Sequence, residues 1–181
     1  MFDVHYHLIF GVDDGPKTIE SSLELARASI AEGVTHIVAT PHASSRYPYQ
    51  RELNEERLKT LRECFGDTVT LGLGCDFHLS FDNMEDFAKE PTRFTINGSK
   101  YLLVEFPDFV NKDVFDRVFF QIMGAGITPV ITHPERQPTI VSNPALLVDW
   151  VGMGCLVQVT AASLWGQFGE SAKALSKKLI Q

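Results

Sequence analysis

His5 and His7 form an H-x-H pair near the amino end of the chain, where the first apolar segment ends. Side chains two residues apart in a β-strand point to the same face, so the two imidazoles would lie side by side. Two imidazoles on one face suit a Zn, Fe or Mn ion. A packed or surface-exposed histidine pair has the same spacing, so further donors are needed before the pair indicates a metal site.

Such donors follow four later apolar segments, at the points where strands are predicted to end. They are His42, Asp76, Glu105 and His133. The carboxylates suit harder ions such as Mn and Mg. Together with the histidine pair the donors exceed one tetrahedral site. The set therefore indicates two or three metals bridged by a carboxylate, the arrangement that clamps a phosphoryl group and activates water.

Two turns beside these donors carry further candidates. Asp13-Asp14-Gly15 is typical of a tight turn, but its place just after the histidine pair favours a ligand role for one aspartate. Arg136 follows His133 by three residues, where a bidentate guanidinium would suit a phosphate. A salt bridge from Arg136 to a neighbouring carboxylate is an equally open interpretation.

The remaining histidines and the cysteines are interpreted as structural. His36 precedes its predicted strand and is expected to be a surface or packing residue. His78 shares a face with Asp76 and could reach the site, but a position in the core or at the rim is favoured. The cysteines form no CxxC pair and are expected to be reduced, mostly buried residues of a cytosolic protein. They are Cys64, Cys75 and Cys155.

Alternating strands and helices must position the candidate residues. Nearly continuous apolar runs predict six strands, at residues 2–5, 36–40, 69–74, 101–106, 128–132 and 155–159. Amphipathic stretches predict helices at residues 18–32, 52–64, 112–123 and 143–152. This alternation predicts an α/β protein with parallel strands. Because His, Asp or Glu follows five strands in succession, a β/α barrel is favoured, since its strand ends surround a common centre.

The whole chain has the composition of an ordinary globular protein. Its 181 residues, 44% hydrophobic and 22% charged, suit one domain. The net charge of −7 argues against nucleic-acid binding, and it disfavours a phosphate ester unless bound cations reverse the local field. No apolar stretch approaches the ~18–20 residues of a membrane span. The amino end lacks the pattern of a signal peptide, so a cytoplasmic protein is expected.

Six segments, which together span nearly the whole chain, carry a family resemblance. They are DVHYH, GVDDGPKT, SLELARASIAEGVTHIVATPH, YLLVEFP, GITPVITHPER and LVQVTAASLWGQFG. Through them the chain resembles the polymerase and histidinol phosphatase (PHP) superfamily. Within it, the chain is most similar to the bacterial protein-tyrosine phosphatases of capsule and exopolysaccharide gene clusters. The resemblance implies a distorted seven-stranded, TIM-like β/α barrel with three divalent metals, Mn being expected and Fe, Mg or Zn being alternatives. It also implies attack on phosphorus by a metal-activated water, without a phosphocysteine.

The resemblance also implies roles for single residues. His5 and His7 would hold the first metal, and Asp76 would bridge the first and second. Glu105 and His133 would complete the second metal site. Asp14 and His42 would hold the third metal, and Arg136 would bind the substrate phosphate. The catalytic residues so implied are Arg136, His42 and His133.

Two departures from the family pattern are present. The bridging position is usually Glu, and Asp76 is shorter by roughly one C–C bond, about 1.5 Å. The family also closes its site with an Asp-x-His after a seventh strand, and this chain stops at Gln181 without that motif. We therefore expect residues 1–181 to be a single PHP domain from which the final strand is missing, as in part of a longer chain. A short, inactive protein is the alternative.

The function expected from the resemblance is hydrolysis of phosphotyrosine on proteins. The expected substrate is a bacterial tyrosine kinase that regulates capsular or exopolysaccharide synthesis. One alternative is a phosphatase for a small metabolite such as histidinol phosphate. Another is a non-catalytic metal-binding or docking module, which the missing Asp-x-His favours. Neither nucleic acid nor membrane insertion is expected, and the oligomeric state is left open.

Overall fold

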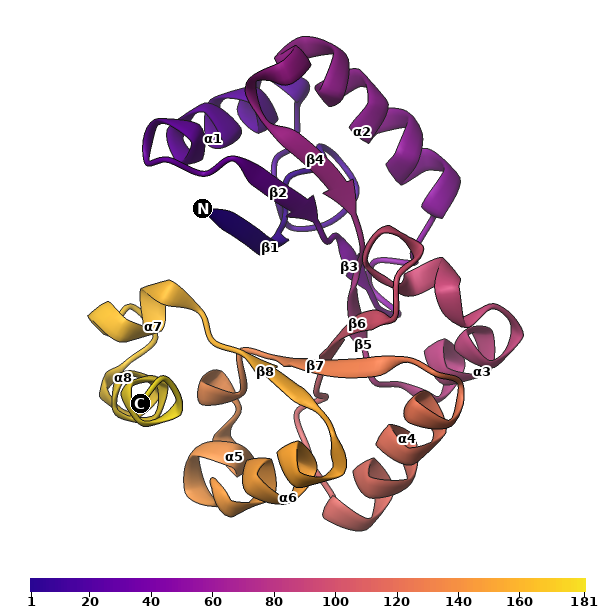
Figure 1. Ribbon diagram of the computed structural model, residues 1–181, viewed down its shortest axis with the longest axis vertical. Coiled ribbons are helices and arrows are strands. Elements are labelled where there is room, and N and C mark those ends of the chain that lie inside the picture. Colours follow the sequence, from indigo (N-terminus) through magenta and orange to yellow (C-terminus); the bar gives the residue numbers. More distant parts are fainter. The chain divides into compact units, whose positions relative to one another are not determined.

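The computed structural model describes residues 1–181, which form two compact units. The first unit comprises Met1–Phe77 and Phe81–Ser99, and the second comprises His78–Ser80 and Lys100–Gln181. Figure 1 shows the strands and helices of both units.

The first unit contains a parallel sheet with the order β1-β2-β4. Its strands are β1 (Phe2–Tyr6), β2 (His36–Ala39) and β4 (Thr70–Leu73). Helices α1 (Ile19–Ala31) and α2 (Arg51–Phe65) connect them (Figure 1). Because parallel crossovers are right-handed, successive crossovers in one direction place both helices on the same side of the sheet.

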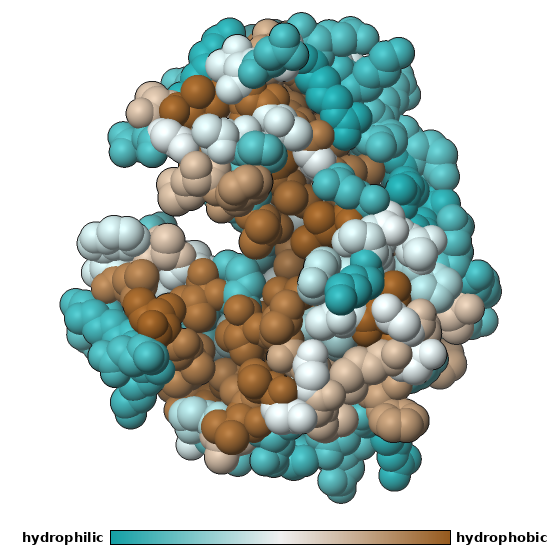
Figure 2. Space-filling model, viewed as in Figure 1, coloured by the Kyte–Doolittle hydropathy of each residue, from teal (hydrophilic) through white to brown (hydrophobic).

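Packing of the two helices on the sheet builds the core of the first unit. Leu58 and Leu61 of α2 are fully buried and belong to the same apolar cluster as Ile37 of β2 and Ala26 of α1. The opposite face of α2 is hydrophilic, as Figure 2 shows. This division between an apolar and a polar face is the amphipathic pattern from which the helices were predicted.

Two short strands in the first unit were not predicted. They are β3 (His42–Ala43) and β5 (Asp76–His78), whose last residue already belongs to the second unit. The two strands pair in parallel with His42 opposite Asp76. Two candidate ligands therefore begin short strands of their own, whereas we expected them to follow β2 and β4 directly. The rest of the unit comprises helix α3 (Phe81–Lys89) and the 3₁₀ turns η1 (Gly66–Thr68), η2 (Pro91–Phe94) and η3 (Ile96–Gly98).

The second unit contains three parallel strands in the order β6-β7-β8. They are β6 (Tyr101–Glu105), β7 (Thr128–Thr132) and β8 (Leu156–Gln158). Helix α4 (Lys112–Gly124) connects β6 to β7. The 3₁₀ turn η4 (Pro134–Arg136) and helices α5 (Pro138–Ser142) and α6 (Ala145–Met153) connect β7 to β8. Helices α7 (Ala161–Trp165) and α8 (Glu170–Leu179) follow.

An aromatic cluster forms part of the core of the second unit. The Phe106 ring lies 5.1 Å from Phe115 and 5.2 Å from Trp150, and the Phe119 ring lies 5.3 Å from Trp150, between ring centroids. The Trp150 indole N–H donates to Asp116 Oδ1 at 2.7 Å, which satisfies the polar atom of this otherwise buried ring. The cluster fixes α4 and α6 beside the strand that ends at Glu105.

The α/β class and the parallel strands are confirmed. All six predicted strands and four predicted helices are present, with boundaries that differ by at most two residues. Neither unit contains a closed barrel, so the seven-stranded barrel remains a prediction. The sequence underestimated the number of strands because β3 and β5 are too short to show an apolar period.

The cysteine prediction was wrong at one position. Cys75 and Cys155 are buried as expected, but Cys64 is exposed. Leu58, Leu61 and Phe65 occupy the inward face of α2, so the Cys64 side chain faces solvent.

None of the helices has the length and apolar character that crossing a membrane requires.

Candidate metal site

His5 and Asp76 form the first close pair of candidate ligands. His5 lies on β1, and its Nε2 is 3.3 Å from Oδ2 of Asp76, the first residue of β5. The Asp76 side chain is completely buried. A fully buried carboxylate needs a partner of opposite charge or strong hydrogen-bond donors, so a bound cation would suit this position.

His7 is held by an aspartate for which no separate role was predicted. Its Nδ1 lies 2.8 Å from Asp13 Oδ2. Asp13 also accepts hydrogen bonds from the backbone N–H groups of Gly15 at 2.9 Å and His42 at 3.1 Å. Burial by itself would raise the pKa of Asp13, but these hydrogen bonds, with that from His7 the largest, lower it below its usual value. The contact leaves the other ring nitrogen of His7 available for a metal.

The adjacent Asp14 completes a second group of donors. Its side chain is exposed, and Oδ1 lies 3.7 Å from His7 Nδ1 and 3.6 Å from His42 Nε2. The two aspartates of the turn thus have different positions, since Asp13 is buried against the backbone and Asp14 faces outward. Gly15 permits this turn, because a Cβ there would lie 2.8 Å from the His7 carbonyl oxygen.

His42 connects the two groups of donors. Its Nδ1 lies 3.6 Å from Asp76 Oδ2. The Tyr47 ring lies nearly parallel to the imidazole, at 13° and with 5.9 Å between centroids. His42 is therefore oriented by its place in β3, by the backbone contact with Asp13 and by an aromatic neighbour.

These side chains have the donor types and spacing that a divalent cation requires. One ligand atom from each of His5, His7 and Asp76 lies within 4.8 Å of the others, and the same holds for His7, Asp14 and His42. Imidazole nitrogens mixed with carboxylate oxygens suit Mn, Fe or Zn. Because His7 belongs to both groups, the first unit could hold more than one ion.

The remaining two candidate ligands meet in the second unit. His133 Nε2 lies 3.7 Å from Glu105 Oε1, and His78 Nδ1 lies 3.8 Å from Glu105 Oε2. From the sequence we favoured a core or rim position for His78. The strand face that His78 shares with Asp76 was the signal that it could reach the site instead. The remaining histidine, His36, packs against the Phe2 ring at 4.2 Å, as predicted.

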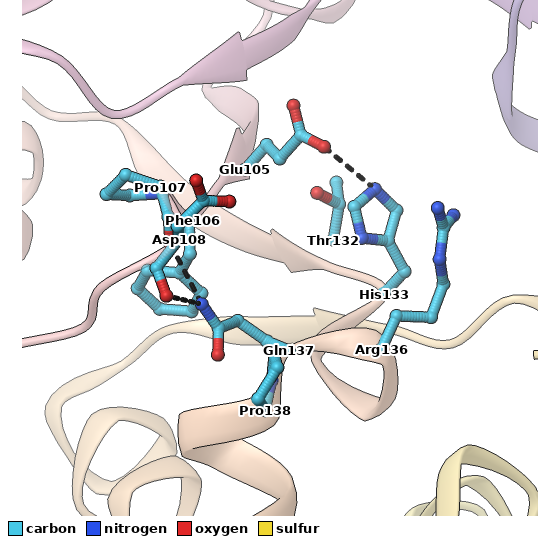
Figure 3. A pocket seen from close by; sticks show the side chains of 9 residues that line it. All are labelled: Glu105, Phe106, Pro107, Asp108, Thr132, His133, Arg136, Gln137 and Pro138. Atoms are coloured by element: carbon cyan, nitrogen blue, oxygen red, sulfur yellow. Dashed lines mark hydrogen bonds and ion pairs between the residues drawn. The ribbon is translucent and has the colours of Figure 1, made fainter.

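His133 has an unusual backbone conformation. Its φ of 33° and ψ of 48° are left-handed, which few residues other than glycine adopt. Pro134 follows it directly and begins the turn η4. Backbone strain of this kind concentrates at functional sites, where the surrounding structure imposes it. The turn brings Arg136 next to His133, and Figure 3 shows the two side chains extending in the same direction.

A cavity of about 320 Å³ lies beside His133 and Arg136. Gln137 bridges its rim, because its side-chain amide donates to the carbonyl oxygens of Pro107 at 2.8 Å and Asp108 at 3.1 Å (Figure 3). The salt bridge that the sequence left open for Arg136 is not found. Its guanidinium instead lies over the Phe168 ring, 4.3 Å from the centroid.

The buried thiols are poorly suited to act as nucleophiles. Burial raises the pKa of Cys75 well above its usual value and raises the pKa of Cys155 to about 12. A thiol must ionise before it attacks phosphorus, so both would be inert near neutral pH. The candidate donor groups described above consist of histidines and carboxylates, and neither buried thiol belongs to them.

A family model described as capsular polysaccharide synthesis, CpsB/CapC, matches residues 1–181. The chain belongs to the CpsB/CapC family. This result confirms the resemblance found in the sequence. Other members include CapC of Staphylococcus aureus, which is 36% identical over 185 residues that cover 99% of this chain and 72% of CapC.

Two further CpsB/CapC relatives are named as tyrosine-protein phosphatases. YwqE of Bacillus subtilis is 33% identical, with 100% of this chain and 72% of YwqE covered. CpsB of Streptococcus pneumoniae is 32% identical, with 98% of this chain and 75% of CpsB covered. A solved structure described as YwqE and CpsB, metal-dependent tyrosine phosphatases, matches with a TM-score of 0.85 and 33% identity, over 99% of this chain and 74% of that chain.

Proposed function

We propose that this protein is a metal-dependent protein-tyrosine phosphatase. The names of YwqE and CpsB and the description of their solved structure support the activity. The observation that carries the proposal is the pair of overlapping donor groups around His7, whose ligand atoms lie close enough together to hold a cation. Catalysis by bound ions also needs no thiol nucleophile, in agreement with the raised pKa of the buried Cys75 and Cys155.

We propose seven side chains as metal ligands, holding three divalent ions, with Mn as the expected ion. They are His5, His7, Asp14, His42, Asp76, Glu105 and His133. The contacts of five of them within the first unit and of Glu105 with His133 in the second support this set. Asp76 would be the bridging carboxylate, and its burial between His5 and His42 supports that role.

When bound, the divalent ions would supply an activated water and positive charge for the phosphoryl group. The protein contributes positioning. Asp13 holds the His7 ring through Nδ1 and the β3 backbone through the N–H of His42. Arg136 would bind the phosphate of the substrate, since its guanidinium has no carboxylate partner and can donate two parallel hydrogen bonds to phosphate oxygens.

The substrate we propose is a tyrosine-phosphorylated protein, with a bacterial tyrosine kinase of capsule synthesis as the specific partner. The CpsB/CapC family description supports the link to capsular polysaccharide. We further propose that the protein acts in the cytoplasm, which its three free cysteines support. The parallel strands with helical crossovers in both units support one PHP domain of the distorted barrel type.

Metal analysis combined with substrate comparison tests the proposal. Purified protein should contain more than one equivalent of divalent transition metal and should hydrolyse a phosphotyrosine peptide. Excess chelator should abolish the activity, and added Mn²⁺ should restore it. A matched phosphoserine peptide and histidinol phosphate serve as comparisons. Preference for histidinol phosphate would indicate a metabolite phosphatase, and metal binding without any hydrolysis would indicate a docking module. Retained activity in metal-free protein would contradict the mechanism.

A further inference from the structure

Glu135 is a buried carboxylate directly between His133 and Arg136 in the chain, in the turn η4. Its side chain is completely buried. Oε1 accepts hydrogen bonds from the backbone N–H of Thr160 at 3.0 Å and from the Ser163 hydroxyl at 2.7 Å. Neither partner is a cation, and Oε2 is buried without a hydrogen-bond partner. A carboxylate in such surroundings is unfavourable, so its presence calls for a role other than filling space.

Arg136, the next residue in the chain, contacts Phe168, which follows Ser163 by five residues. Its guanidinium lies over the ring of Phe168, 4.3 Å from the centroid. Phe168 is 40% exposed, and a cavity of about 460 Å³ lies beside it, so the ring is not fixed by a close-packed core. The contact with Arg136 is a specific interaction of this partly exposed ring.

The two contacts enclose residues 160–169, here called the clasp segment. Glu135 binds its beginning at Thr160 and Ser163, and Arg136 contacts Phe168 near its end. The short helix α7 spans the middle. Gly166 and Gly169 have positive φ values of 89° and 92°, which glycine adopts readily and other residues rarely do. They turn the chain on both sides of Phe168. Glu135 thus anchors the start of the segment that carries the Phe168 ring near its end.

We propose that Phe168 and Glu135 are positioning residues for Arg136, with Phe168 supporting the guanidinium directly and Glu135 anchoring the clasp segment that carries Phe168. The inference rests on the proposed function, in which Arg136 binds the phosphate. An aromatic face orients a guanidinium without neutralising it. A carboxylate partner would orient it too, but it would compete with the phosphate for the same N–H donors. The clasp segment therefore holds Arg136 in place and leaves its donors available.

Binding of inorganic phosphate tests the role of Phe168. Calorimetry is performed on the full chain loaded with metal, with the metal content measured for each variant. Phe168→Leu keeps an apolar side chain but removes the aromatic face, so phosphate affinity should fall about three- to tenfold, as expected for a lost cation–π contact. Trp165→Leu is the matched control, because Trp165 lies in the same segment, is 76% exposed and should leave affinity unchanged.

A double-mutant cycle separates positioning from a general structural effect. In an Arg136→Ala background, Phe168→Leu should cause no further loss of phosphate affinity. An equal loss in both backgrounds, or no loss in the wild-type background, would overturn the inference. Phosphate that binds independently of Arg136 would overturn it as well.

Two substitutions of Glu135 distinguish the effect of its charge from the effect of its hydrogen bonds. Glu135→Gln keeps an acceptor for Thr160 and Ser163 and should retain most of the phosphate affinity, whereas Glu135→Ala should lose as much as Phe168→Leu. If Glu135→Ala does not fold, Ser163→Ala removes one of the same hydrogen bonds and should show a smaller loss in the same direction. Loss with Gln but not with Ala or Ser163→Ala would refute the anchoring role.

The proposed function and this inference can fail separately. Calorimetric phosphate binding needs no turnover. If phosphate binding depends on Arg136 and Phe168 but no phosphotyrosine peptide is hydrolysed, the proposed function fails and the inference stands. If the peptide is hydrolysed and Phe168→Leu changes neither KM nor phosphate affinity, the inference fails alone.

Discussion

His42 and Asp76 lie opposite each other as register partners of the two short strands β3 and β5, with His42 Nδ1 3.6 Å from Asp76 Oδ2. They are 34 residues apart in sequence, so only the parallel pairing brings them together. Each also lies near a second candidate ligand: His42 is close to Asp14, and Asp76 is close to His5. This pair is the point at which the two donor groups of the first unit meet.

Removal of His42 should therefore impair both donor groups. We expect His42→Ala to lower kcat for a phosphotyrosine peptide by at least about a hundredfold, since changes to outer-sphere partners alone cost ~10–100-fold. Metal content, measured by elemental analysis, should fall in parallel. His36→Ala is the control, because His36 packs against Phe2 away from the donors. Full metal content and activity in His42→Ala would remove this residue from the ligand set.

Cysteine substitutions should leave turnover nearly unchanged. We expect Cys75→Ser and Cys155→Ser, and the exposed Cys64→Ser, to keep kcat within a few-fold, because the attacking group in the proposed mechanism is water and burial raises the pKa of both buried thiols. Steady-state kinetics with a phosphotyrosine peptide is the measurement. A loss in any one variant as large as that of His42→Ala would instead indicate a phosphocysteine mechanism.

Substitution of Gly15 should disturb the turn that holds His7. A Cβ at this position would lie 2.8 Å from the His7 carbonyl oxygen and 3.0 Å from Asp13 Oδ1. We expect Gly15→Ala to lower the free energy of unfolding by about 1–3 kcal/mol, as overpacking does, and to weaken metal binding. Gly124→Ala, in α4 with no atom within 4 Å of the added Cβ, should be neutral or slightly stabilising. Chemical denaturation and metal titration of both variants check this result, and equal behaviour would contradict it.

The Asp116 carboxylate should make stability depend on pH. Hydrogen bonds from Lys112 and then from Trp150 lower its pKa below the usual value. The folded state therefore favours the ionised carboxylate, so its contribution is complete above the ordinary pKa of 3.8 and is lost as pH falls through the folded pKa. Urea unfolding at pH 6 and pH 3, followed by Trp fluorescence, should show a smaller pH dependence for Asp116→Asn than for wild type. An unchanged dependence would mean that these contacts do not stabilise the ionised form.

The candidate donor residues could be picked from the sequence because their types and their places relative to the apolar runs are local features. His5 and His7 share a strand face, and Glu105 and His133 end strands β6 and β7 or follow them directly, as periodicity indicated. The α/β class follows from the same patterns. The family resemblance then supplied an activity that donor chemistry alone leaves broad.

The tertiary structure decided how the donors are held. The sequence could not separate Asp13 from Asp14, because their difference lies in contacts with His7 and with the backbone of a residue 29 positions away. Nor could it decide whether Arg136 forms a salt bridge, since the Phe168 ring that the guanidinium contacts instead belongs to a segment more than 30 residues later. Residue type and spacing specify which chemistry is available, but hydrogen bonds, ring contacts and burial between distant segments determine which atoms remain available for a ligand.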